Sequence, residues 1–261
     1  MRVVILCNYL NSNYARAVLR ALNARGMRRI HIVAAVGATT PRTVAGLWQK
    51  YRFALPRVVL RSIATRLAWW MARAQDRKAA SEPSLEAETI AQRGKFVVVR
   101  EINGEEGCSA LQSLETDLLV LAGTPIIRAA VLAVPRIGTL NAHQGALPKF
   151  RGMNVIEWAV FESSPPTISI HFVDPGVDTG DVILDEAVPL RPGDTVVSVR
   201  ERASARQVDL LADAAAAVLA GRFSRRTQRA GEGRQYFTMH PRLRAVAERR
   251  LQEKVGTPAN G

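Results

Sequence analysis

The chain has 261 residues, of which 48% are hydrophobic and 23% are charged, as in a globular protein with one large α/β domain and a buried core. No run of 18 apolar residues occurs, so we expect no transmembrane helix. The two cysteines are too few for a disulfide framework or a four-cysteine zinc site. The N-terminal MRVVILCNYL resembles a strand more than a signal peptide, so we expect a cytoplasmic protein.

The formal net charge of +13 is concentrated in two segments. Residues 41–80 carry a net charge of +8 and residues 222–261 a net charge of +7, which leaves the rest of the chain at −2. A nearly neutral body argues against a domain built around a basic groove. A nucleic-acid partner is therefore disfavoured but stays open.

Alternating strand and helix patterns follow one another along the chain. Short apolar runs predict strands at Val3–Cys7, 30–35, Phe96–Val99, 118–121, 137–140, 167–173 and 182–188. Helical spacing predicts helices from Ala15 toward Gly26 and over 105–114, 126–132, 153–161 and 195–220. This alternation predicts an α/β fold with a doubly wound, mostly parallel sheet. We expect one domain over residues 1–221 and a short basic extension over 222–261.

The basic segment 41–80 interrupts this alternation. Pro56 precedes a helical stripe of apolar residues, and most of the arginines lie off that stripe, which predicts an amphipathic helix or helical hairpin inserted in the domain. A lid with a solvated basic face is the simplest interpretation. Contact with an anionic membrane surface, a partner or an anionic substrate stays open.

Several common motifs of α/β proteins are missing. No G-x-G-x-x-G follows the first strand, no phosphate-binding G-x-x-x-x-G-K-[ST] occurs, and no G-x-S-x-G occurs. Nicotinamide cofactors, phosphate-loop nucleotide hydrolysis and the usual hydrolase elbow therefore have little support. The acidic residues 174–185 resemble a calcium loop, but Gly176 stands where a ligand belongs and Thr179 replaces the turn glycine. We expect no metal site.

Asn141 and His143 end a predicted buried strand. Side chains two residues apart on a strand point to the same face, and open α/β sheets bind ligands at the carboxyl ends of their strands. The glycine- and proline-containing loop 145–152 follows, and a turn-rich acidic loop at 174–181 can bring a carboxylate toward His143. The pattern predicts a site that combines an amide, an imidazole and a carboxylate.

Two segments carry a resemblance to a known family. GTLNAHQGALPKFRG (138–152) and TISIHFVDPGVDTGDVI (167–183) resemble the folate-dependent formyltransferases, which include the glycinamide ribonucleotide, methionyl-tRNA and amino-sugar enzymes. The family signature is an asparagine, a histidine two residues later, and an aspartate about 35 residues beyond in a turn. Asn141, His143 and Asp178 match it.

The resemblance implies transfer of a formyl group from 10-formyltetrahydrofolate to the amino or hydroxylamino group of a small-molecule acceptor, through a tetrahedral intermediate. Whether that acceptor is anionic stays open. Asn141 and His143 would stabilise the developing oxyanion, and His143 would help to protonate the departing folate nitrogen. Asp178 would orient His143 or take the amine's proton through water. The residues implied to line the pterin pocket are Thr124, Pro125, Ile126, Ile127, Asp174, Pro175, Gly176 and Val177.

The loop HQGALP departs from the family pattern, because Gly145 stands where a serine is common and Ala146 where a leucine is common. Their effect on acceptor placement stays open, as do the oligomeric state, including a homodimer, and the acceptor's identity. The alternatives are methionyl-tRNA formylation, hydrolysis of 10-formyltetrahydrofolate, and a non-catalytic basic binding protein. The tRNA enzymes usually carry a β-barrel domain after the catalytic one, whereas only the basic extension 222–261 follows the long predicted helix here. The hydrolases usually carry an N-terminal regulatory domain, whereas this chain begins with its first predicted strand. Both alternatives are therefore disfavoured but stay open.

Overall fold

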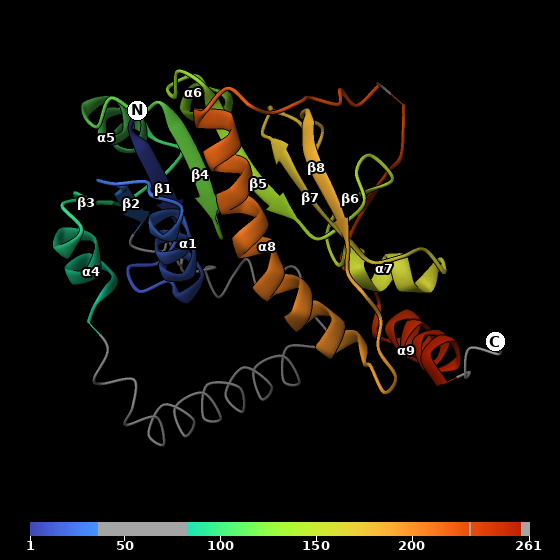
Figure 1. The fold of residues 1–261 in the computed structure, drawn as a ribbon. Coiled ribbons are helices and arrows are strands. Elements are labelled where there is room, and N and C mark those ends of the chain that lie inside the picture. The colour runs from blue at the N-terminus through green and yellow to red at the C-terminus, as the bar shows by residue number, and fades with distance from the viewer. Residues whose placement is uncertain (36–82, 230, 257–261) are drawn as a thin grey trace, which may run out of the picture.

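The computed structural model describes residues 1–35, 83–229 and 231–256. Its centre is a seven-stranded sheet in the order β3-β2-β1-β4-β5-β7-β8 (Figure 1). These strands span Val3–Cys7 (β1), His31–Ala35 (β2), Phe96–Val99 (β3), Leu118–Ala122 (β4), Gly138–His143 (β5), Thr167–Phe172 (β7) and Val182–Ala187 (β8). β1 to β5 run parallel, whereas β7 is antiparallel to both β5 and β8. The predicted α/β fold with a mostly parallel sheet is confirmed.

Helices cover both faces of the sheet, because the strands are apolar on both sides. In β1, Val3, Ile5 and Cys7 belong to one buried cluster, and Val4 and Leu6 to another. The first cluster packs under α1 (Asn13–Ala24), α4 (Leu85–Ala91) and α8 (Val196–Leu219), and the second under α5 (Glu105–Ser113) and α6 (Ala129–Leu132). Continuous apolar runs of this kind are typical of parallel strands that are buried on both faces.

The helices begin where side chains can cap their free N–H groups. Ser12 caps α1 by accepting a hydrogen bond from Ala15 N, and Thr195 and Ser198 form a reciprocal capping box at α8. Arg25 near the end of α1 pairs with Asp209 and Asp213 of α8. These contacts join α1 and α8, which lie side by side on the same face of the sheet.

The 126–132 helix prediction was too long. Residues 124–128 are not helical, and α6 is a single turn, Ala129–Leu132. Asn103 holds this segment open, since its amide donates to Ile126 O and its carbonyl accepts from Arg128 N. A tertiary contact thus overrides the local helical pattern.

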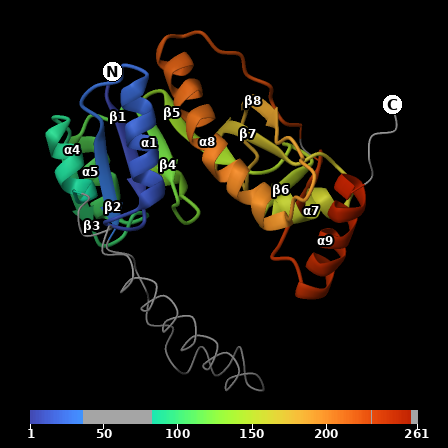
Figure 2. The same ribbon diagram turned by 60° about the horizontal axis from the view of Figure 1, so that its bottom comes forward.

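The C-terminal extension contains structure that the sequence patterns did not predict. β9 (Arg234–Tyr236) pairs in parallel with β6 (Phe150–Gly152), and α9 (Pro241–Gly256) packs against α7 (Val155–Phe161). Both views place α7 and α9 together at the end of the molecule opposite α4 (Figures 1 and 2). The predicted insertion at 41–80 lies outside the described residues, and the predicted domain boundary stays a prediction. No helix in the described ranges is long and apolar enough to cross a membrane.

Candidate active site

Four polar side chains meet where β5 and β7 lie side by side. The antiparallel register places Asn141 opposite His171 and His143 opposite Ser169. Asp178 reaches the same place from the turn after β7, with its backbone in the left-handed region at φ 53°. The structure thus brings Asn141, His143 and Asp178 to one place, and their catalytic roles stay predictions.

Asp178 lies between the two imidazoles. Its Oδ2 atom is 3.5 Å from Nδ1 of His143, and its Oδ1 atom is 3.6 Å from Nε2 of His171. Asn141 Nδ2 lies 3.4 Å from the same nitrogen of His171. The backbone N–H of Gly152 donates a 2.9 Å hydrogen bond to Asp178 Oδ2.

These surroundings set the charge of the catalytic candidates. Burial acts to raise the pKa of Asp178, but contact with His171, the nearby His143 and the Gly152 N–H together hold it at about 2. Burial lowers the pKa of His143, against the opposing effects of the Asp178 carboxylate and the Phe150 carbonyl. At neutral pH the site therefore contains an ionised Asp178 and an uncharged His143.

His143 is buried behind the cavity wall, with only 7% of its surface exposed. Its Nε2 atom lies 2.7 Å from the carbonyl oxygen of Phe150, so Nε2 carries the hydrogen and Nδ1 faces Asp178. Gly145 allows this approach: a Cβ there would lie 2.6 Å from Phe150 O and 2.8 Å from His143 Nε2. The departure from serine at this position thus has a local steric consequence.

A cavity of about 680 Å³ opens beside these groups, a size typical of small-molecule sites. Asn141, His171 and Asp178 line it. So do most residues implied for the pterin pocket, namely Thr124, Pro125, Ile126, Ile127, Asp174, Gly176 and Val177. Pro175 and His143 are not among the lining residues. The two basic residues of the loop 145–152, Lys149 and Arg151, do not line the cavity either. Lys149 Nζ donates a hydrogen bond to Ser164 Oγ, and Arg151 Nε donates one to Pro148 O.

The cavity lining also contains residues that the sequence patterns did not assign to a site. They are Tyr14, Gln144, Gly152, Met153, Gln207, Gln235, Tyr236 and Phe237. Three of the large apolar side chains that stand exposed, Ile126, Met153 and Phe237, lie on this cavity. Exposed apolar surface in a hollow is typical of a ligand-contact site.

His171 is a further functional candidate, and the sequence alone leaves open whether it is structural or faces the site from the neighbouring strand. The alternation in TISIHF places Ser169 and His171 on one face of β7, which was an available signal. The register against β5 was not readable from the sequence. Nothing in the sequence of residues 234–237 indicated that they reach the cavity.

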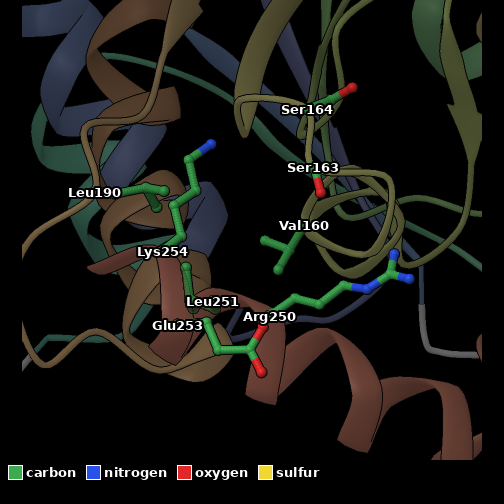
Figure 3. A pocket seen from close by; sticks show the side chains of 8 residues that line it. All are labelled: Val160, Ser163, Ser164, Leu190, Arg250, Leu251, Glu253 and Lys254. Atoms are coloured by element: carbon green, nitrogen blue, oxygen red, sulfur yellow. The ribbon is translucent and has the colours of Figure 1, made fainter. Parts of the chain in front are cut away.

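A second hollow of about 620 Å³ lies between α7 and α9 and contains none of these residues (Figure 3). Its lining combines Val160, Leu190 and Leu251 with Arg250 and Lys254. Arg250 binds α7, because it donates a hydrogen bond to Phe161 O and stacks on the Phe161 ring at 4.6 Å.

A group of His, Cys, Asp and Glu side chains that could hold a metal ion does not occur in the part of the chain that the structure describes.

Comparison with known proteins gives a consistent picture. A family model described as "Formyl transferase" matches residues 1–215. The methionyl-tRNA formyltransferase of Methylacidiphilum infernorum is 33% identical over 126 residues, which is 48% of this chain and 39% of that protein. The chain thus spans less than half the length of the curated relatives it matches.

Solved structures share the fold at low sequence identity. A sugar N-formyltransferase from Shewanella sp FDAARGOS_354 superposes with a TM-score of 0.59 at 14% identity, over 96% of this chain and 87% of that one. An N-formyltransferase from Helicobacter canadensis, solved with folinic acid and dTDP-3-aminofucose, gives a TM-score of 0.57 at 11% identity, over 97% of this chain and 80% of that one.

Proposed function

Because the chain belongs to the formyl transferase family, we propose that it transfers the formyl group of 10-formyltetrahydrofolate to the amino or hydroxylamino group of a small molecule. The observation that carries this proposal is the meeting of Asn141, His143 and Asp178 beside one cavity. Family membership alone does not identify a reaction, whereas this geometry suits acyl transfer to an amine.

The folate donor supplies an activated formyl carbonyl, and the side chains supply the rest of the chemistry. The Asn141 amide donates to the oxygen on which negative charge develops, a contact typically worth about 10²- to 10³-fold in rate. Neutral His143, which lies behind the cavity wall, accepts the proton of the attacking amine at Nδ1 through a water molecule beside Asp178 and returns it by the same route to the departing folate nitrogen. Ionised Asp178, 3.5 Å away, stabilises the imidazolium while it exists. The products are a formamide and tetrahydrofolate.

The wall formed by Thr124–Ile127 and the 174–177 turn suits the folate ring. The segment is extended rather than helical, and the Ile126 side chain is 70% exposed although it lies on the cavity. Folinic acid bound to the Helicobacter canadensis protein supports this ligand class. Fluorescence titration with 5-formyltetrahydrofolate measures the interaction directly.

The acceptor would lie against the rest of the cavity lining. Gln144, Gln207 and Gln235 offer amide groups there, and Tyr236 and Phe237 offer aromatic faces. Neither Lys nor Arg occurs among the described residues that line the cavity. We therefore expect the enclosed part of the acceptor to be uncharged and to contain hydroxyl or amide groups. A homodimer and a cytoplasmic location remain part of the same hypothesis.

Methionyl-tRNA formylation is the second candidate, because the curated relatives carry that name and the extension after α8 is basic. The lining contains two aspartates and, among its described residues, no Lys or Arg, which favours a small acceptor over an anionic nucleic acid. Hydrolysis of the donor by water would use the same side chains, and a non-catalytic binding role would leave them without a purpose.

Mass spectrometry of amine metabolites incubated with the protein and 10-formyltetrahydrofolate tests the proposal. We expect one acceptor class to gain a single formyl unit. Asn141→Ala, His143→Ala and Asp178→Ala should each lower turnover by about 10²-fold or more, with the melting temperature little changed. His240→Ala removes an exposed imidazole as the matched control. Near-normal turnover in any two of the three site variants would reject the mechanism.

A further inference from the structure

The C-terminal extension contacts two segments that hold His143 and Asp178, namely β6 and the turn at Asp178–Gly180. After α8 the chain returns along β8, where Val182 and Arg226 exchange backbone hydrogen bonds, and then reaches β6 (Figure 1). Two parts of it contact the site, Gln228 and β9 (Arg234–Tyr236), and we call these two parts the C-terminal clamp.

The first contact passes through β6, whose backbone holds two catalytic candidates. The carbonyl of Phe150 accepts the hydrogen of His143 Nε2 at 2.7 Å. The N–H of Gly152, two residues later, donates to Asp178 Oδ2 at 2.9 Å. A shift of this three-residue strand would therefore move the imidazole and the carboxylate relative to each other.

β9 fixes the position of β6. Phe150 pairs with Arg234, and Gly152 with Tyr236. The Tyr236 ring stacks on the Phe150 ring with centroids 5.3 Å apart, and Tyr236 O accepts a 2.9 Å hydrogen bond from Met153 N. The two strands approach so closely that a Cβ on Gly152 would lie 2.2 Å from Tyr236 O. A three-residue strand has little stability alone, so its register depends on this partner.

Gln228 provides the second contact, because it binds the Asp178 turn directly. Its Nε2 atom donates to Asp178 O at 3.0 Å and to Gly180 O at 2.6 Å. Asp178 adopts a left-handed backbone conformation, which a non-glycine residue keeps only when its surroundings enforce it. Two hydrogen bonds from one side chain, 50 residues away in the sequence, supply that restraint.

We propose that the C-terminal clamp sets the geometry of His143 and Asp178, with Gln228 and Tyr236 as positioning residues. The proposal rests on the proposed formyl transfer for its effect on rate. Misplacement of a catalytic group by about 1 Å can cost about a hundredfold in rate, and neither clamp residue has to touch a reacting atom to exert this effect.

Two pairs of variants test the clamp in the full chain. Gln228→Met keeps the length of the side chain and removes its donors, and Arg229→Met is the control at an exposed neighbouring position. Tyr236→Ala removes the ring, and Tyr236→Phe restores it. With 10-formyltetrahydrofolate and hydroxylamine as the amine probe, we expect Gln228→Met and Tyr236→Ala to lower kcat by about ten- to a hundredfold. The dissociation constant for 5-formyltetrahydrofolate and the melting temperature of Gln228→Met should stay unchanged, and Tyr236→Phe should recover kcat.

Histidine ring signals in NMR spectra provide a readout that does not need turnover. The chain has only four histidines, and His31→Gln and His240→Gln variants identify the two outside the site. Gln228→Met should displace the signals of His143 or His171 and leave those of His31 and His240 in place. If Tyr236→Ala fails to fold, Gln228→Met against Arg229→Met still decides the matter.

The outcomes separate the two proposals. Wild-type protein that transfers no formyl group to any amine would reject the proposed function, while the ring signals would still report whether Gln228 orders the site. Wild-type kcat in Gln228→Met, or reduced kcat with all four histidine signals unchanged, would overturn the clamp.

Discussion

Their surroundings keep His143 neutral and Asp178 negatively charged. Burial keeps the imidazole neutral, whereas two histidines and a backbone N–H keep the carboxylate ionised with a pKa of about 2. A carboxylate this acidic is a poor base, so its contribution to the rate comes from orienting His143 and stabilising its positive form. In the proposed reaction the imidazole is then the group that takes the amine's proton.

This assignment predicts the pH dependence of kcat. The neutral imidazole is the active form, and its pKa lies below the ordinary value of 6.5, so kcat should be flat near neutrality and fall only in more acidic solution. In Asp178→Asn the favourable effect of the carboxylate on the imidazolium is lost. The acid limb should therefore move to still lower pH while the plateau drops by about 10²-fold or more.

The kcat profile of wild type and Asp178→Asn, measured at saturating donor and amine, checks this. Glu186→Gln, an exposed carboxylate on β8 that pairs with Arg206, is the control and should leave the limb unchanged. An acid limb above 6.5, or one that rises in Asp178→Asn, would contradict the neutral-imidazole assignment.

The sequence predicts the three signature residues but not their neighbours. Asn141 and His143 share a face because they are two apart on one strand, a local rule that holds in any strand. His171 joins them through cross-strand register, and Gln228 and Tyr236 through a chain reversal after α8. Such pairings depend on tertiary packing, which local patterns do not encode.

At the scale of elements, local sequence patterns predict where the strands lie better than they predict the direction in which neighbouring strands run. The apolar runs place β1 to β4, β7 and β8 within one residue of their observed bounds, whereas β5 continues three residues beyond the run that ends at 140. The short elements β6 and β9 escape prediction, because three residues are too few to show a period. α8 is predicted almost to its ends, since its capping signal at Thr195 and its apolar stripe agree.

α8 offers a matched test of the packing that supports the site. Val199 is fully buried in the main core, whereas Val197, on the same helix, is 49% exposed. Val199→Ala removes two buried methyl groups, which contribute about 0.8 kcal/mol each, and leaves a cavity. It should therefore lower the free energy of unfolding by about 1.5–3 kcal/mol. Val197→Ala should change it by less than about 0.5 kcal/mol.

Urea unfolding of both variants, followed by circular dichroism, measures the difference. Equal losses in Val199→Ala and Val197→Ala would show that α8 is not packed on the sheet as described.

At the scale of the whole molecule, the sequence predicts a nearly neutral body that is followed by a basic extension. In the structure β9 of this extension pairs with β6, and α9 packs on α7. Many of its arginines make structural contacts: Arg226 binds Asp185 and Leu147 O, and Arg225 stacks on Phe172 at 4.1 Å. Positive charge there thus has internal uses that need no nucleic acid.

Salt dependence therefore distinguishes a small acceptor from tRNA. An acceptor bound through 6–10 phosphates loses about 10³- to 10⁵-fold in affinity between about 50 and 200 mM salt, because condensed counterions are released on binding. An uncharged amine held by glutamine amides and aromatic rings releases none. We expect kcat/KM for the small amine found in the metabolite screen to change by less than about threefold over that range, since only weak screening remains. Charged initiator tRNA assayed in parallel should accept no formyl group at either salt concentration, and tRNA formylation that collapses at 200 mM would instead establish the nucleic-acid acceptor.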